Sequence, residues 1–171
     1  MTDSTGVPIT AEPSVGSRNC NLPSVAEIPV GFVYVPAGRA LFGASGDLAR
    51  RKLLPGLFHL DRAGHLSDCR VIGTSLEPMD NAGFRRLARE SCESFGRGRV
   101  DEADWDRFER RLSWVDGSSG AAGLSDAVAE AEADIGEECL RLHYLSVPPA
   151  AASAVIKLID EAGLVDRARI I

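Results

Sequence analysis

Residues 43–53 read Gly-Ala-Ser-Gly-Asp-Leu-Ala-Arg-Arg-Lys-Leu and directly follow the apolar pair Leu41-Phe42. This order predicts a strand, a tight turn and then a helix. Gly43 would allow a sharp turn out of the strand, Gly46 would let backbone N–H groups approach a diphosphate, and Ala49 would keep the helix close to the sheet. Taken alone, the Gly-x-x-Gly-x-x-Ala spacing is a weak signal, because glycine-rich turns of this kind also occur where nothing binds.

The composition is that of an ordinary globular protein with room for one substantial core. The chain has 171 residues, of which 44% are hydrophobic and 26% charged. A net charge of −6 without a sustained basic run argues against nucleic acid or an anionic membrane as the main partner. The triplet Arg50-Arg51-Lys52 makes the local charge positive. It either attracts an anionic ligand or is a solvated helix face.

The cysteines and the N-terminus predict a reduced, cytoplasmic protein without a metal site. The four cysteines are scattered, with no Cys-x-x-Cys pair and no histidine at ligand spacing: Cys20, Cys69, Cys92 and Cys139. There is no signal peptide pattern and no run approaching about 18 apolar residues, so neither secretion nor a membrane span is expected.

The chain divides into a tail and a domain. Residues 1–30 are rich in Ser, Thr, Pro and Gly and predict a disordered tail, whereas the rest of the chain predicts a folded domain. The segment 32–35 has strand composition, but Pro-Ala-Gly at 36–38 interrupts it, so we expect a shortened first strand ending at Phe42.

Strand and helix patterns alternate along the rest of the chain. Strands are expected at 69–73, 112–115, 140–147 and 169–171, and helices after the glycine turn, at 84–95, from about 101, at 124–135 and at 151–162. Asp47 would cap the first helix and Pro55 would kink it. The last helix would turn four residues inward: Val155, Ile156, Leu158 and Ile159. This alternation predicts an α/β fold with a mostly parallel sheet and flanking helices.

Two stretches together resemble one family. The pattern of glucose-6-phosphate dehydrogenases runs Gly-Ala-Ser-Gly-Asp-Leu-Ala, basic residues, Lys-Leu and Pro, and residues 43–55 match at each place. Residues 141–149, Arg-Leu-His-Tyr-Leu-Ser-Val-Pro-Pro, are similar to the family's Arg-x-Phe-Tyr-Leu-Ala-Leu-Pro-Pro. Two matches in the right order indicate the N-terminal coenzyme-binding domain of this family. The resemblance implies that residues 38–171 are a partial NAD(P)-binding domain of the Rossmann type, with an incomplete doubly wound sheet.

The resemblance implies an oxidoreductase that converts glucose 6-phosphate to 6-phosphogluconolactone, the first oxidative step of the pentose phosphate pathway, with NADP as cofactor. The coenzyme ligands that it implies are Gly43, Ala44, Ser45, Gly46, Asp47, Leu48, Ala49, Arg50 and Tyr144. Pro148-Pro149 would shape the loop near the nicotinamide. Judged from the strand alone, without the family match, Tyr144 is better interpreted as a packed core residue than as a ligand.

Cofactor choice is where the chain departs from the family. Leu76 stands where many members carry an arginine that pairs with the 2′-phosphate of NADP. We therefore expect weakened NADP preference or tolerance of NAD. Arg50 or Arg51 could substitute for the arginine, and Glu77 is either an exposed loop residue or a partner of the free ribose hydroxyls.

The family's later motifs do not occur in this sequence. Ile171 stands where the family continues into Glu-Lys-Pro, and the later Arg-Ile-Asp-His segment is also missing. We therefore expect the C-terminal substrate domain to be absent, no catalytic residue in this chain, and no turnover by the fragment alone. His59, His65 and His143 are expected to be surface or packing residues. Family members are homo-oligomers that bind glucose 6-phosphate.

Three other interpretations compete with this one. A non-catalytic nucleotide-binding remnant, or a partner of a full-length relative, stays open. A short-chain reductase needs Tyr-x-x-x-Lys, but Tyr144 is followed at +4 by Pro148. A phosphate-loop NTPase needs Gly-Lys-Ser/Thr, which does not follow Gly46.

Overall fold

The computed structural model describes residues 37–66, 68–135 and 140–171. The tail predicted at 1–30, the segment 32–36, Cys20 and Cys139 lie outside this part. These described residues belong to one compact unit. Its elements are β1 (Ala37–Phe42), the π-helical turn η2 (Ala49–Leu53), α1 (Leu54–Arg62), β2 (Cys69–Ser75), α2 (Asn81–Phe95), α3 (Glu102–Glu109), β3 (Leu112–Asp116), the short 3₁₀-helix η3 (Gly117–Ser119), α4 (Gly120–Ile135), β4 (Leu140–Leu145), α5 (Pro149–Glu161) and β5 (Ala168–Ile170).

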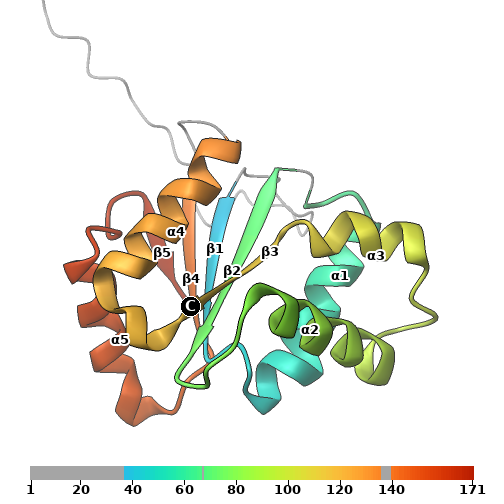
Figure 1. Cartoon of the computed structure of the whole chain (residues 1–171), viewed down its shortest axis with the longest axis horizontal. Coiled ribbons are helices and arrows are strands. Elements are labelled where there is room, and N and C mark those ends of the chain that lie inside the picture. The colour runs from blue at the N-terminus through green and yellow to red at the C-terminus, as the bar shows by residue number, and fades with distance from the viewer. Residues whose placement is uncertain (1–36, 67, 136–139) are drawn as a thin grey trace, which may run out of the picture. The chain divides into compact units, whose positions relative to one another are not determined.

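The strands form a five-stranded parallel sheet in the order β3-β2-β1-β4-β5. Helices α1, α2 and α3 lie on one side of this sheet, and α4 and α5 lie on the other (Figure 1). The chain moves outward from β1 to β3 and then returns to the other side of β1 with β4. The predicted doubly wound α/β fold is therefore confirmed, with its switch point between β1 and β4.

Both faces of the sheet are buried, as expected for parallel strands. On the side of α1 to α3 the strands contribute Leu41, Val71, Leu112 and Trp114. On the side of α4 and α5 they contribute Ala40, Phe42 and Ile72. Strand positions alternate between the two layers because successive side chains point to opposite faces.

The helix after the glycine turn is π-helical over η2 and becomes α-helical at Leu54. Pro55 has no N–H, and its ring would clash with the carbonyl of Arg51 in a regular α-helix. A π-turn widens the ladder at this point. The interruption predicted at Pro55 is thus present as a change of helix type.

Two local predictions were wrong. Ala37 and Gly38 do not interrupt the first strand, because β1 begins at Ala37 and both residues pair with the start of β2. Ile156 does not turn inward: its side chain is 46% exposed, whereas Ile159 of the same helix is fully buried. Ile156 fits the hydrophobic pattern of α5, but it lies on the outer face of the helix and is not part of the core.

Candidate dinucleotide-binding site

The glycine turn joins the carboxyl ends of three strands. The N–H groups of Gly43 and Ala44 donate to the carbonyl oxygen of Thr74 in β2 at 2.9 and 3.1 Å. Gly43 has φ +75°, and a Cβ at this position would lie 2.2 Å from the carbonyl oxygen of Ser146, just after β4. Glycine is therefore required here both by the backbone angle and by the close approach.

The helix starts immediately after Gly46. The Gly46 N–H donates to the Gly43 carbonyl at 2.9 Å, and the Gly46 carbonyl accepts from the Arg50 N–H at 3.0 Å. Ala49 is fully buried, as its predicted role of bringing the helix close to the sheet requires. The first N–H groups of any helix have no intrahelical partner, and they favour an anion together with the helix dipole. The turn thus presents donors suited to a diphosphate at the switch point of the sheet.

The predicted cap by Asp47 is wrong. No side chain caps this helix at its N-terminus. Because the Gly46 carbonyl already accepts the first helical hydrogen bond, Asp47 lies inside the first turn, and its carboxylate pairs with Arg51 at 2.9 Å. Both side chains are largely exposed, so the pair contributes little to stability. Arg51 also lies over the ring of Phe95, 5.2 Å from its centre.

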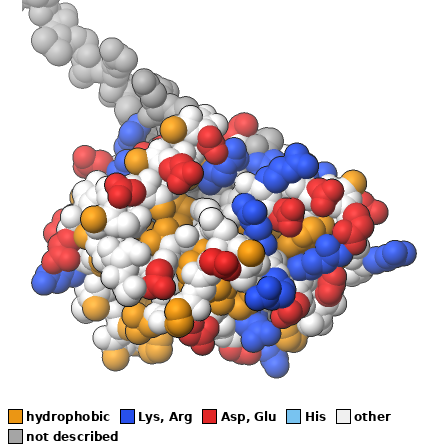
Figure 2. Space-filling view, viewed as in Figure 1, with side chains coloured by type: hydrophobic (Ala, Val, Ile, Leu, Met, Phe, Trp, Pro, Cys, Tyr) orange, Lys and Arg blue, Asp and Glu red, His pale blue; other side chains and the backbone are white. Residues whose placement is uncertain are grey.

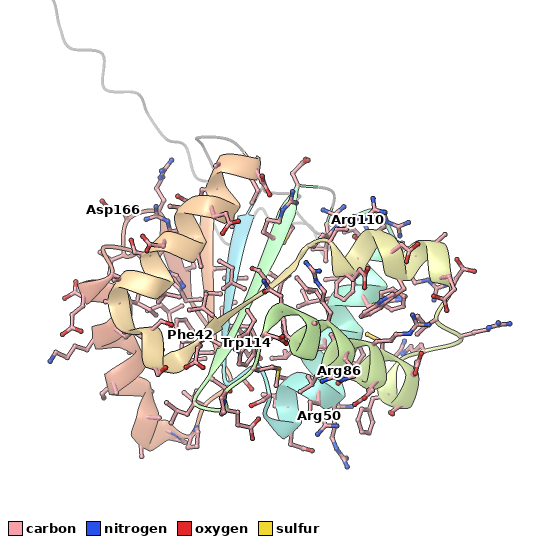
Figure 3. The ribbon with its side chains drawn as sticks, viewed as in Figure 1. Phe42, Arg50, Arg86, Arg110, Trp114 and Asp166 are labelled. Atoms are coloured by element: carbon pink, nitrogen blue, oxygen red, sulfur yellow. The ribbon has the colours of Figure 1, made fainter. Side chains whose placement is uncertain are left out.

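Leu48 and Arg50 are exposed beside the turn, and Arg50 makes no ion pair within the described residues. In Figure 3, Arg50 lies near the carboxyl end of the sheet, below α2. The structure thus leaves Arg50 available to an anion, while Arg51 is engaged by Asp47 and Phe95.

A pair of hydroxyl groups links the glycine turn to the end of β2. Ser45 Oγ donates to Ser75 Oγ at 3.1 Å, and Ser75 Oγ also accepts from the Glu77 N–H at 3.1 Å. Leu76 between them is 93% exposed. Sequence reasoning missed Ser75, although a serine at the end of the second strand becomes a candidate once the β1–β2 register is known.

Tyr144 lies in β4 directly opposite Leu41 of β1, and it packs partly buried against the core on the side of α1 to α3. Pro148 and Pro149 begin α5. These residues share the sheet's carboxyl edge with the glycine turn.

The histidines lie as expected. His59 and His65 are exposed, and His143 is 1% exposed with its Nε2 at 3.1 Å from the Leu164 carbonyl. Burial lowers the pKa of His143. The described residues hold no cluster of three His, Cys, Asp or Glu side chains placed to bind a metal ion.

The cysteines of the described part are reduced thiols. Cys69 and Cys92 are both buried. Burial raises the pKa of the Cys92 thiol to about 12, which keeps it protonated. Among the helices of the described part, none is long and apolar enough to cross a membrane.

A doubly wound parallel sheet with a glycine turn and a helix N-terminus at its switch point defines a dinucleotide-binding domain of the Rossmann type. Residues 40–171 match the family model described as "Glucose-6-phosphate dehydrogenase, NAD binding domain". The chain therefore belongs to the glucose-6-phosphate dehydrogenase family, as its two motifs predicted.

Relatives and solved structures agree with this assignment. Glucose-6-phosphate 1-dehydrogenase 1 of Mycobacterium tuberculosis is 35% identical over 131 residues, covering 76% of this chain and 27% of the relative. The Chlamydia pneumoniae enzyme is 34% identical over 131 residues, covering 74% of this chain and 26% of the relative.

The crystal structure of glucose-6-phosphate 1-dehydrogenase from Mycobacterium avium has a TM-score of 0.67 at 29% identity, covering 79% of this chain and 29% of that one. A glucose-6-phosphate dehydrogenase in complex with its substrate glucose-6-phosphate has a TM-score of 0.67 at 27% identity, covering 81% and 30%. The chain thus spans about a quarter of the length of the curated relatives it matches.

Proposed function

We propose that this chain is the coenzyme-binding part of an NADP-dependent glucose-6-phosphate 1-dehydrogenase of the pentose phosphate pathway. The observation that carries the proposal is the glycine turn, where any side chain at Gly43 would collide with Ser146 and where the helix starts directly at Gly46. The coenzyme would accept a hydride at its nicotinamide ring. The buried, reduced thiols of Cys69 and Cys92 support a cytoplasmic location.

The diphosphate would bind over residues 43–50. A Cβ at Gly46 would lie 3.1 Å from the Gly43 carbonyl, so the bare Cα leaves the backbone open to a ligand. The helix N-terminus supplies donors and a favourable dipole, and Arg50, which forms no ion pair with any other described residue, supplies a charge. Tyr144 would approach the coenzyme from β4.

The adenosine end of the site can bind a free ribose diol, and it lacks the arginine that pairs with a 2′-phosphate in many family members. Leu76 offers no charge, and loss of a charge-assisted arginine contact costs on the order of 2 kcal/mol. Ser75 Oγ already accepts two hydrogen bonds, so its own O–H group can donate to a ligand. Ser45 Oγ donates its O–H group to Ser75, so its lone pairs can accept from a ligand. A vicinal diol both donates and accepts, but a phosphate dianion only accepts. We infer that NAD is tolerated, with Arg50 the residue left to meet the 2′-phosphate of NADP.

Fluorescence titration with reduced coenzyme tests the site. Gly46→Val should weaken binding at least about tenfold, because a branched side chain would cover the backbone donors at the helix start. The matched control is Gly56→Val in α1, where nothing lies within 4 Å of an added Cβ. Equal affinities of a folded Gly46→Val protein and the control would refute the assignment.

We expect these 171 residues by themselves to bind coenzyme without oxidising glucose 6-phosphate. Removal of the C1 hydroxyl proton needs a base. His143 is buried, and His59 and His65 are exposed in the last turn of α1 and just beyond it. Reduced-coenzyme formation from glucose 6-phosphate at an ordinary enzymatic rate, in protein free of host dehydrogenase, would contradict this expectation.

A further inference from the structure

Four arginine side chains converge at the edge of the sheet opposite the glycine turn. They come from the start of β2, from α3 and from the two residues after it, and with Ala103 and Asp106 they line an open cavity of about 500 Å³: Arg70, Arg107, Arg110 and Arg111. We call this the arginine cavity. Figure 3 places Arg110 near the amino end of β3, far from Arg50 at the carboxyl end of the sheet. On the face shown in Figure 2, basic side chains gather around the sheet end of α3.

Three of these guanidinium groups share two acceptors. Asp61, whose side chain is 1% exposed, accepts from Arg111 Nε at 2.7 Å and from Arg107 Nε at 3.0 Å. The Cys69 carbonyl accepts from Nη1 of both Arg70 and Arg111, at 3.4 Å each. These contacts fix the positive groups beside one another, although like charges repel.

The partners of the cluster leave donors unused. Arg70 also pairs with Asp134, and Arg107 with Asp104, each through one nitrogen. Within the described residues, Nη2 of Arg70 and Nη1 of Arg107 donate to no protein group, and the side chain of Arg110 makes no hydrogen bond or ion pair. Guanidinium groups that are already held in place lose little freedom when they bind an oxyanion.

We propose that the arginine cavity binds a small phosphate monoester, separately from the dinucleotide. Its volume lies in the range of small-molecule sites. The arginines would hold the phosphate, and Asp106, the acidic residue of the lining, would accept from a hydroxyl group of the ester. Asp61 lies in the last turn of the helix that begins at Gly46, so the two anion sites lie at opposite ends of one helix.

Calorimetric titration of the whole chain at constant ionic strength tests the proposal, with inorganic phosphate and glycerol 3-phosphate as probes. We expect saturable binding, tighter for the ester, that Arg110→Ala weakens at least about fivefold. The Arg110 side chain is exposed and has no partner in the part of the chain that the structure describes, so its removal should leave the fold intact, which circular dichroism checks. The matched control is Arg86→Ala, an exposed arginine of α2 without a partner in the described residues.

Gly46→Val separates this site from the dinucleotide turn, because it should weaken coenzyme binding and leave ester binding unchanged. Absence of saturable binding would overturn the proposal. Two other results would also overturn it. One is that Arg86→Ala and Arg110→Ala weaken ester binding equally, and the other is that Gly46→Val is the only variant that loses ester binding.

Discussion

The side chain of Asn81 caps the edge of the sheet, because its Oδ1 accepts a 2.6 Å hydrogen bond from the backbone N–H of Trp114. One turn further along α2, Arg85 donates through Nε and Nη2 to the Leu112 carbonyl at 3.3 and 3.2 Å. β3 is the last strand on this side of the sheet, so its outward backbone groups would otherwise be open to another chain. Helix α2 satisfies two of them with side chains.

Replacing Asn81 by alanine should lower the free energy of unfolding by about 1–2 kcal/mol, because it leaves the Trp114 N–H without its partner. Urea denaturation followed by tryptophan fluorescence measures this change. Arg86→Ala on the same helix is the control and should stay within about 0.5 kcal/mol of the parent. Equal stabilities of the two variants would show that the cap contributes nothing.

Gly43→Ala should cost far more than an ordinary glycine replacement. Gly64 has nearly the same backbone angle, φ +78°, but nothing lies within 4 Å of an added Cβ there. Gly64→Ala therefore isolates the cost of the left-handed angle, about 1–2 kcal/mol. Gly43→Ala adds the 2.2 Å clash with Ser146, and we expect a further loss of about 1–3 kcal/mol. Thermal unfolding of both variants measures the two losses of stability, and equal losses would contradict this expectation.

Leu76→Arg should shift coenzyme preference toward NADP by roughly 10- to 30-fold, which corresponds to about 2 kcal/mol. Leu76 is 93% exposed, so the replacement should not disturb the core. Val165→Arg, at an exposed apolar position after α5, controls for added charge. The measurement is the ratio of dissociation constants for NAD and NADP. A hundredfold preference of the parent chain for NADP would show that the leucine is no handicap.

The glycine turn could be predicted from sequence because its constraints are local. The positive φ of Gly43 and the burial of Ala49 follow from a strand-turn-helix order within a few residues. Asp47 shows the limit of this reasoning. Sequence alone does not say whether Gly46 or Asp47 is the last residue before the helix, and a shift of one residue turns a cap into an i,i+4 ion pair.

Contacts between distant segments could not be predicted in the same way. Ser45 meets Ser75 only because β1 and β2 pair in a particular register. Asp61 meets Arg107 and Arg111 across 46 and 50 residues, and nothing in the hydrophobic pattern of α1 marks it as a buried acid. Such contacts depend on how the helices pack after the sheet has formed.

His143 should make the stability of the fold depend on pH. Its ring packs against Phe42 with 6.1 Å between ring centres, its Nε2 meets the Leu164 carbonyl, and its Nδ1 is buried without a partner in the described residues. Burial, together with the positive charge of Arg141, lowers its pKa below the ordinary value of 6.5. The folded protein therefore binds fewer protons at this site than the unfolded chain does.

The free energy of unfolding should accordingly be constant above about pH 7. It should fall as the pH drops from about 6.5 to the pKa that His143 has in the folded protein, by at most about 1.4 kcal/mol per pH unit. His143→Phe should remove this dependence while filling a similar volume, because a phenyl ring neither titrates nor buries an unpaired nitrogen. Urea unfolding between pH 5 and 8 measures both slopes. The exposed His59→Gln variant should retain the slope of the parent. If His143→Phe keeps that slope as well, the titration of another group is responsible and the role assigned to His143 is wrong.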